Sequence, residues 1–179
     1  MRLFIAVEVP EEIQSYFLEL QNHINKDLVK IVLTKSFHLT LKFLGEVDES
    51  KKEMIANFLK KIKFEPFSAE LSNIGVFPDE NYIRVAWIGL EPKDKIIRLQ
   101  QAIDNALINI FPKDERFHPH ITLGRVKFVK DKKEFITLLK KIKIEKKIFE
   151  VNEFRLIKST LTPEGPVYEI LNNFKTQAL

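Results

Sequence analysis

Apolar residues follow two periodicities along the chain, and each periodicity predicts one kind of element. Short runs in which apolar side chains alternate with polar ones, or in which nearly every residue is apolar, predict strands. The strands expected on this basis lie at 2–8, 30–33, 37–44, 67–77, 82–90, 117–126, 150–161 and 167–174.

Apolar residues spaced three to four positions apart predict helices between these strands. The first helix begins at Pro10, where a proline and two following acidic residues suit a helix N-terminus, and it continues to about residue 26. A second helix begins after a cap at Asp48 or Ser50 and ends before Pro66. Further helices are predicted at 92–110 and 132–142.

Strands and helices are mixed along the chain, and turn sequences at 78–81 and 162–166 join neighbouring strands as hairpins. This mixture predicts an α+β fold with antiparallel or mixed sheets. No linker or low-complexity segment divides the chain, so residues 1–179 are expected to form a single domain.

Two of the predicted strands carry the same four-residue pattern of histidine, apolar residue, threonine and apolar residue. Residues 38–41 read His-Leu-Thr-Leu, and residues 120–123 read His-Ile-Thr-Leu. Because side chains alternate between the faces of a strand, each pattern sets an imidazole and a hydroxyl on one face and two aliphatic side chains on the other. One copy lies in each half of the chain. We therefore expect a bilobal, pseudo-two-fold arrangement, with two sheets facing across a central cleft and helices on the outside.

The paired pattern suggests acid–base chemistry on a phosphorus atom. Histidine is the side chain best suited to proton transfer near neutral pH, so His38 and His120 on opposite sides of one phosphorus would act as acid and base. The hydroxyls of Thr40 and Thr122 are placed to stabilise phosphoryl oxygens, and no metal is then required. A single His-x-Thr strand is an ordinary structural feature, but two chance copies are expected only about once in a hundred such chains.

Composition narrows the class of protein further. The chain has 179 residues, 45% of them hydrophobic and 30% charged, as expected for one globular domain. It contains no cysteine, which excludes disulfides and thiolate metal sites. The apolar start at 1–7 is too short to span a bilayer and lacks a signal-peptide cleavage site, so we expect a soluble, cytoplasmic protein without membrane association. Nothing in the sequence demands more than a monomer, and a monomer is expected. The net charge of +4 mildly favours a phosphate-bearing partner.

A metal site is not expected. His118 and His120 share a strand face, but zinc needs at least a third protein ligand, and none is evident in the sequence. We interpret His118 as structural or as part of the cleft rim, and His23 as an exposed helical residue. No cofactor is predicted.

The chain resembles the 2H phosphoesterase superfamily, which is defined by two His-x-Thr-apolar motifs. Within that superfamily it is similar to the RNA 2′,3′-cyclic phosphodiesterase branch, also known as 2′-5′ RNA ligase. The resemblance covers nearly the whole chain and is carried by residues 2–7, 37–45, 119–125 and 159–168.

The resemblance implies opening of an RNA 2′,3′-cyclic phosphate to a 2′-phosphomonoester, with His38 as proton donor to the 3′ oxygen and His120 as the base that activates water. It also implies a phosphate contact for Arg125. Strict alternation turns Arg125 away from His120, but Gly124 offers a place for a bulge that redirects it. Lys42 shares strand parity with His38, and it is either a further phosphate ligand or a solvated lysine.

Several choices stay open on the sequence alone. The physiological reaction is hydrolysis or, alternatively, 2′-5′ ligation, for example of tRNA halves; a non-catalytic protein that binds RNA ends and an enzyme acting on a cyclic nucleotide metabolite are further hypotheses. Phe4 and Phe43 either stack on a base or pack in the core. The lysines between 127 and 147 are either an RNA-facing patch or a solvated helix face.

Overall fold

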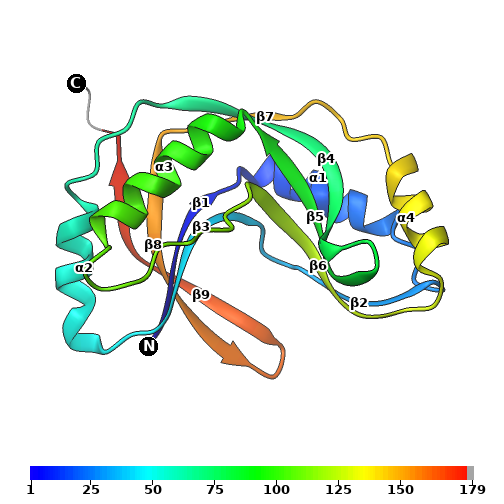
Figure 1. The fold of residues 1–179 in the computed structure, drawn as a ribbon, viewed down its shortest axis with the longest axis horizontal. Helices are drawn as coiled ribbons and strands as arrows, with labels where there is room; N and C mark the ends of the chain where they lie inside the picture. Colours follow the sequence, from blue (N-terminus) through cyan, green and yellow to red (C-terminus); the bar gives the residue numbers. More distant parts are fainter. Residues whose placement is uncertain (177–179) are drawn as a thin grey trace.

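The structure, a computed structural model that describes residues 1–176, contains one antiparallel sheet of nine strands. The strand order is β7-β4-β5-β6-β3-β1-β8-β9, and β2 pairs with β6 beside this path. Figure 1 shows the sheet curled into an arch. The strands are β1 (Arg2–Glu8), β2 (Val29–Leu33), β3 (His38–Glu46), β4 (Phe67–Asp79), β5 (Tyr82–Glu91), β6 (His120–Val129), β7 (Ile148–Val151), β8 (Glu153–Thr162) and β9 (Gly165–Lys175).

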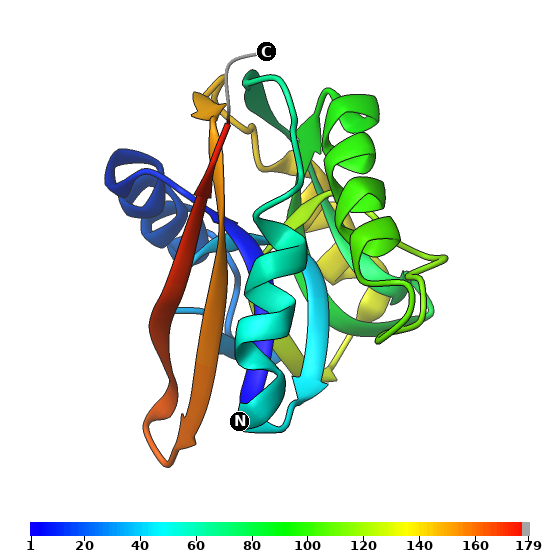
Figure 2. The same cartoon turned by 90° about the vertical axis from the view of Figure 1, so that its left-hand side faces the viewer.

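Helices cover the outer side of both halves of the arch. They are α1 (Glu11–Asn22), α2 (Lys52–Leu59, after a 3-10 turn at Glu49–Lys51), α3 (Lys93–Ala106) and α4 (Lys132–Lys141). In Figures 1 and 2, α2 and α3 lie beside the half formed by β3, β1, β8 and β9, while α1 and α4 lie beside the other half. The α+β class predicted from the sequence is confirmed.

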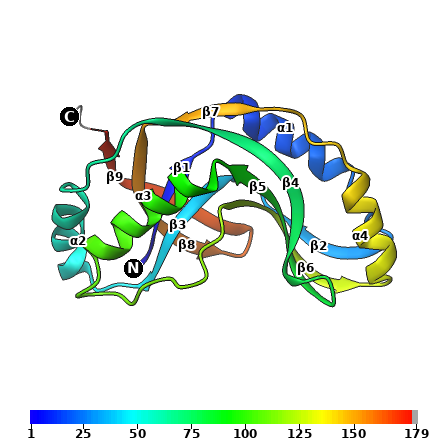
Figure 3. The same ribbon diagram turned by 45° about the horizontal axis from the view of Figure 1, so that its top comes forward.

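The two halves meet at a single backbone pairing. Strands β3 and β6 are joined only through Leu39 and Ile121, and the strands diverge on either side of this pair. Two separate sheets were expected, but the structure has one continuous sheet that is narrowed at this seam and curved around it (Figure 3). One shared pair keeps both motif strands in a common register, while strand twist lets the two halves turn apart.

Local pattern predicted one strand at 150–161, whereas the structure has two. Residues of β7 pair with β4, and residues of β8 pair with β1 in the other half, so the chain crosses the molecule at Asn152. The second motif strand begins at His120 rather than at residue 117, because Pro119 has no N–H to donate to the strand ladder. The pairing of β7 and β8 with strands from different halves cannot be predicted from the short apolar run at 150–161.

One large apolar core runs through both halves. Each half is also bonded to a helix that directly follows a strand of the other half. After β1 the chain enters α1, where Gln21 Nε2 donates 2.8 Å to the carbonyl oxygen of Leu123 on β6. After β5 it enters α3, where Asp104 pairs with Lys42 on β3. Crossed connections of this kind make the halves interdependent and match the pseudo-two-fold expected from the motifs.

Within residues 1–176, no helix is both long enough and apolar enough to cross a bilayer. The same residues hold no group of three or more His, Asp or Glu side chains arranged to bind a metal ion. The last three residues of the predicted 1–179 domain lie outside the described part of the chain.

Lys42 lies inside the molecule, and the prediction that it faces the cleft is wrong. The register of β1 against β3 passes from Ala6–Thr40 to Ile5–Lys42 and skips Leu41, which marks a β-bulge. The bulge reverses the alternation, so Lys42 turns to the buried side and is only 4% exposed.

The Lys42 ammonium is held there by a complete set of acceptors. It pairs with Asp104 and donates 2.7 Å to the carbonyl oxygen of Pro112. Burial alone would raise the pKa of Asp104, but hydrogen bonds from Lys42, the Asp114 amide and Gln100 together hold that pKa below its usual value. This buried ion pair therefore joins β3, α3 and the segment after α3.

Replacing Lys42 with Met should lower the free energy of unfolding by about 3–5 kcal/mol, because a buried carboxylate would lose its charged partner. Urea unfolding monitored by circular dichroism measures the change. The control is Lys158→Met, which removes a surface pair with Glu169 (3.4 Å) and should cost about 1 kcal/mol or less. Equal losses in the two variants would show that the buried pair contributes no more than a surface one.

Candidate active site

Both motif strands contain the same bulge at the same position. In β6 the register against β5 passes from Trp87–Thr122 to Ala86–Gly124 and skips Leu123, as β3 skips Leu41. The bulge expected at Gly124 is thus confirmed. Gly124 in β6 is equivalent to the buried Lys42 in β3. An added Cβ on Gly124 would lie 2.7 Å from Ile31 Cδ1, so this buried position fits a glycine.

The bulges decide which side chains rejoin the motif face. The residue two positions after each skipped leucine returns to the side of the histidine and threonine. In β3 this residue is Phe43, which is 64% exposed, and in β6 it is Arg125, which is also exposed. Arg125 is therefore redirected toward His120, as a phosphate contact requires.

The motif residues divide between the two faces as alternation predicted. The four aliphatic side chains are fully buried at 0% exposure: Leu39, Leu41, Ile121 and Leu123. The histidines and threonines of both motifs are only partly covered and lie on the opposite face. Antiparallel register about the Leu39–Ile121 pair sets His38 toward Thr122 and Thr40 toward His120. The structure thus brings all four polar residues to one seam.

His120 is held in one tautomer by the backbone. Its Nδ1 lies 2.6 Å from the carbonyl oxygen of His118, which can only accept, so Nδ1 carries the proton and Nε2 keeps a free lone pair. The ring packs edge-on against Phe77, with centroids 4.9 Å apart. Burial lowers the pKa of His120, as do the charges of His118 and Arg125, although the bond to the carbonyl opposes them. A neutral imidazole with an available Nε2 is suited to accept a proton.

His38 is enclosed by aromatic rings instead. Phe4 lies 4.9 Å and Tyr168 5.4 Å from the imidazole, measured between ring centroids, and Tyr168 meets it edge-on. Burial lowers the pKa of His38 to about 4, and the charges of His120 and Arg125 add to the effect. In the free protein His38 is therefore neutral at physiological pH, and an anion beside it would favour its protonated form.

Arg125 is the cation that both histidines share. Its charge lowers the pKa of His38 and of His120, and it partly offsets the burial that raises the pKa of Tyr168. The register of β6 turns Arg125 to the motif face, and its charge acts on groups of both halves. The two imidazoles, the two hydroxyls and this guanidinium therefore make up the candidate site.

Two neighbours of the site were not singled out from the sequence. Tyr168 on β9 closes over His38, and the sequence marks it only as the last residue of the C-terminal string 159–168. Trp87 on β5 lies 6.2 Å from His120 and 4.9 Å from His118, measured between ring centroids. A lone tryptophan near a strand centre could have been flagged, but its proximity to His120 depends on the pairing of β5 with β6.

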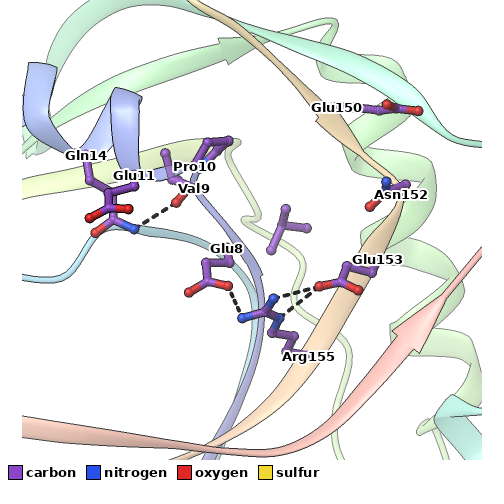
Figure 4. A pocket seen from close by; sticks show the side chains of 10 residues that line it. Glu8, Val9, Pro10, Glu11, Gln14, Glu150, Asn152, Glu153 and Arg155 are labelled. Carbon is purple, nitrogen blue, oxygen red and sulfur yellow. Dashed lines mark hydrogen bonds and ion pairs between the residues drawn. The ribbon is translucent and has the colours of Figure 1, made fainter.

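Two hollows of the structure lie away from these residues. One of about 520 Å³ is lined by the end of β1, the start of α1 and the crossing from β7 to β8 (Figure 4). Within it Arg155 is paired with Glu8 and with Glu153. Another, of about 590 Å³, lies between α2 and β9. Neither of these two hollows is lined by a motif residue.

The protein has an α+β fold with a curled sheet, and two His-x-Thr strands of this sheet set their polar side chains on one face. This arrangement defines the class of two-histidine phosphoesterases. Residues 5–87 and 88–168 match the profile of the LigT-like phosphoesterase family, and the chain belongs to that family. Each matched segment contains one motif, in agreement with the pseudo-two-fold of the fold.

Individual relatives cover the chain almost completely. A Methanocaldococcus jannaschii protein named RNA 2′,3′-cyclic phosphodiesterase is 39% identical over 176 residues, which is 97% of this chain and 100% of the relative. A crystal structure of a Thermus thermophilus protein has a TM-score of 0.77 at 30% identity and covers 98% of this chain and 97% of its own. Escherichia coli LigT in complex with 3′-AMP also has a TM-score of 0.77, at 25% identity, with coverage of 99% and 98%.

Nuclear magnetic resonance titration of the imidazoles should show His38 protonating with a pKa of about 4. Inorganic phosphate should raise this value, because an anion stabilises the imidazolium. Arg125→Met should raise the pKa of both His38 and His120, since a shared positive charge is lost. The control is Arg98→Met on α3, whose guanidinium pairs with Asp94 on the helix surface. Unchanged titration in the Arg125 variant would contradict its placement on the motif face.

Proposed function

We propose that this protein is an RNA 2′,3′-cyclic phosphodiesterase that produces a 2′-phosphomonoester end. The observation that carries the proposal is the convergence of two imidazoles on the motif face that Arg125 shares. They come from strands that are far apart along the chain but paired in the sheet, and they lie in different surroundings. The names of relatives that share nearly the full length of the chain support the substrate class.

In this proposal His120 is the base and His38 is the acid. The free Nε2 of His120 takes a proton from water as its oxygen attacks phosphorus. The bond from phosphorus to O3′ breaks, and O3′ takes a proton from His38. Afterwards the proton on His120 and the vacancy on His38 are exchanged with solvent, which restores the starting state.

The phosphoryl oxygens are bound by Arg125 and by the hydroxyls of Thr40 and Thr122, which stabilise the added negative charge as the pentacoordinate state forms. The bound phosphate diester also raises the low pKa of His38, because its negative charge favours the imidazolium that the acid step needs. Lys42 is left out of this set, since its ammonium is engaged by Asp104 and Pro112.

Ligation is the related alternative. The same two histidines would join a cyclic phosphate to a 5′-hydroxyl, which enters in place of water and forms a 2′-5′ bond. The proposal retains the cytoplasmic location and the monomeric state as predictions. RNA fragments with cyclic phosphate ends, tRNA fragments among them, are the proposed substrates.

A short RNA with a 2′,3′-cyclic phosphate should be converted to a 2′-phosphate end, because the acid protonates O3′. Separation of the products against 2′- and 3′-phosphate standards measures this outcome, and added chelator should leave the yield unchanged. A 3′-phosphate product would contradict the assignment of the leaving oxygen.

Adding a 5′-hydroxyl RNA to the reaction compares ligated with hydrolysed product, and bound but unaltered RNA would favour a protein that only binds RNA ends.

Replacing either His38 or His120 with Ala should lower turnover by about 100-fold or more. A substrate with a p-nitrophenolate leaving group separates the two roles, because that group departs without a proton. On it His38→Ala should lose much less activity than His120→Ala. The control His23→Ala changes an exposed imidazole at the end of α1 and should keep full activity. Equal losses on both substrates would exclude the assignment of acid and base.

A further inference from the structure

A further bulge lies near the far end of β6, where this strand pairs with β2. The register passes from Ile31–Val126 to Lys30–Phe128 and skips Lys127. Val126 is buried in the apolar cluster beneath α4, so Lys127, which follows it, turns to the concave face. As in the two motif strands, the skipped residue and the next one share a side, so Phe128 also lies on the concave face.

This bulge gives the ends of β6 and β2 an exposed apolar surface. Phe128 is 63% exposed, and Val32 on β2 is 57% exposed. Val32 is the ladder partner of Arg125, and Lys30 is the ladder partner of Phe128, so each pair shares a face of the sheet (Figure 1). Lys30, Val32, Lys127 and Phe128 form what we call the β2–β6 patch, which is continuous with the candidate site at Arg125.

The charge of the β2–β6 patch favours a polyanion as its partner. Strands β2 and β6 contain no acidic residue, and their lysine and arginine side chains are Lys30, Arg125 and Lys127. An exposed ring among cations is the kind of surface that binds single-stranded RNA, because bases stack on the ring and phosphates contact the cations. We therefore infer that RNA, and not an apolar partner, covers this patch.

The chemistry of the proposed reaction decides which RNA lies there. O3′ departs beside His38, and it belongs to the RNA that carries the cyclic phosphate. The nucleophile enters in line from the opposite side, beside His120, and the half that carries His120 also carries the β2–β6 patch. In ligation the nucleophile is the 5′-hydroxyl of a second RNA. Its proton goes to His120, the bond from O5′ to phosphorus forms, the bond to O3′ breaks, and O3′ takes a proton from His38.

We propose that the β2–β6 patch binds the RNA that supplies the 5′-hydroxyl in 2′-5′ ligation. The inference rests on the proposed function, because it uses the assignment of His38 and His120 to opposite sides of phosphorus. Phe128 lies three residues beyond Arg125, which is about 10 Å along a strand, so its ring meets a base among the first nucleotides of the second RNA. Lys30 and Lys127 contact the phosphates beside that base. Stacking tolerates every base, so this site selects no sequence.

The test measures ligation and hydrolysis separately. Ligation is followed with a cyclic-phosphate RNA and rising concentrations of a single-stranded 5′-hydroxyl RNA, and hydrolysis with the cyclic-phosphate RNA alone. Phe128→Ala should raise the half-saturating concentration of the 5′-hydroxyl RNA about tenfold, the loss expected for one stacked base. It should leave KM and kcat of hydrolysis unchanged, and Phe128→Trp should restore ligation. When the first three nucleotides of the 5′-hydroxyl RNA lack bases, Phe128→Ala should add no further loss.

Lys30→Gln tests the phosphate contact. It should weaken binding of the 5′-hydroxyl RNA and lower the slope of log affinity against log salt concentration by about 0.7, the value for one lost phosphate contact, whereas Phe128→Ala should keep the slope. The controls are Ile148→Ala, which removes an apolar side chain that is 54% exposed on β7, and Lys158→Gln, which removes a surface charge paired with Glu169. Both should leave ligation and hydrolysis unchanged.

The remaining outcomes would overturn the inference. Equal losses of ligation and hydrolysis in Phe128→Ala would assign the β2–β6 patch to the RNA that carries the cyclic phosphate, and no loss in either reaction would remove its role. Hydrolysis by the wild type without ligated product, even with the 5′-hydroxyl RNA in large excess, would also overturn it and leave the proposed function intact. If the wild type opens no cyclic phosphate, the proposed function itself fails, and the inference fails with it.

Discussion

The packing of four aliphatic side chains against the helices is the constraint on which the candidate site depends. Leu39, Leu41, Ile121 and Leu123 are fully buried, and they hold β3 and β6 in place behind the Leu39–Ile121 pair. Because strand side chains alternate, this burial forces the intervening histidines and threonines onto the concave face. A shift of one residue in either strand would bury an imidazole and expose a leucine, so register and site geometry are maintained by the same apolar contacts.

The β-bulges add the next level of control. Each bulge reverses the alternation of side chains just after its motif. The residue that parity would place in the cleft therefore enters the core, and the residue after it faces the cleft. In β3 the reversal buries Lys42 against Asp104 and frees Phe43 for the concave face. In β6 it buries Gly124 and frees Arg125. The same backbone irregularity thus yields a structural ion pair in one half and a candidate phosphate ligand in the other.

The pseudo-two-fold relates the backbones of the two halves approximately, but the groups around the two motif histidines differ. His120 has a carbonyl partner that fixes its tautomer, while His38 has Phe4 and Tyr168 around it and a pKa of about 4. The proposed acid–base chemistry needs one imidazole protonated and the other neutral, and in the proposal the bound phosphate anion favours the imidazolium of His38. The two motif strands thus carry the same residues in different surroundings, which is the asymmetry that the proposed acid and base require.

Local sequence was sufficient for the features that depend on short-range periodicity and residue identity. The α+β class, most of the element positions and the two His-x-Thr strands follow from alternation and helical spacing, and Gly124 marked its bulge because a glycine is conspicuous in a strand. The bulge at Lys42 carried no such mark, so parity placed that lysine in the cleft. The joining of the halves into one sheet, the split at Asn152 and the closure of Tyr168 over His38 were decided by the tertiary structure. The physical reason is that hydrogen-bond partners from distant strands, and the space left by buried neighbours, set these features, and neither is encoded within a short stretch of chain.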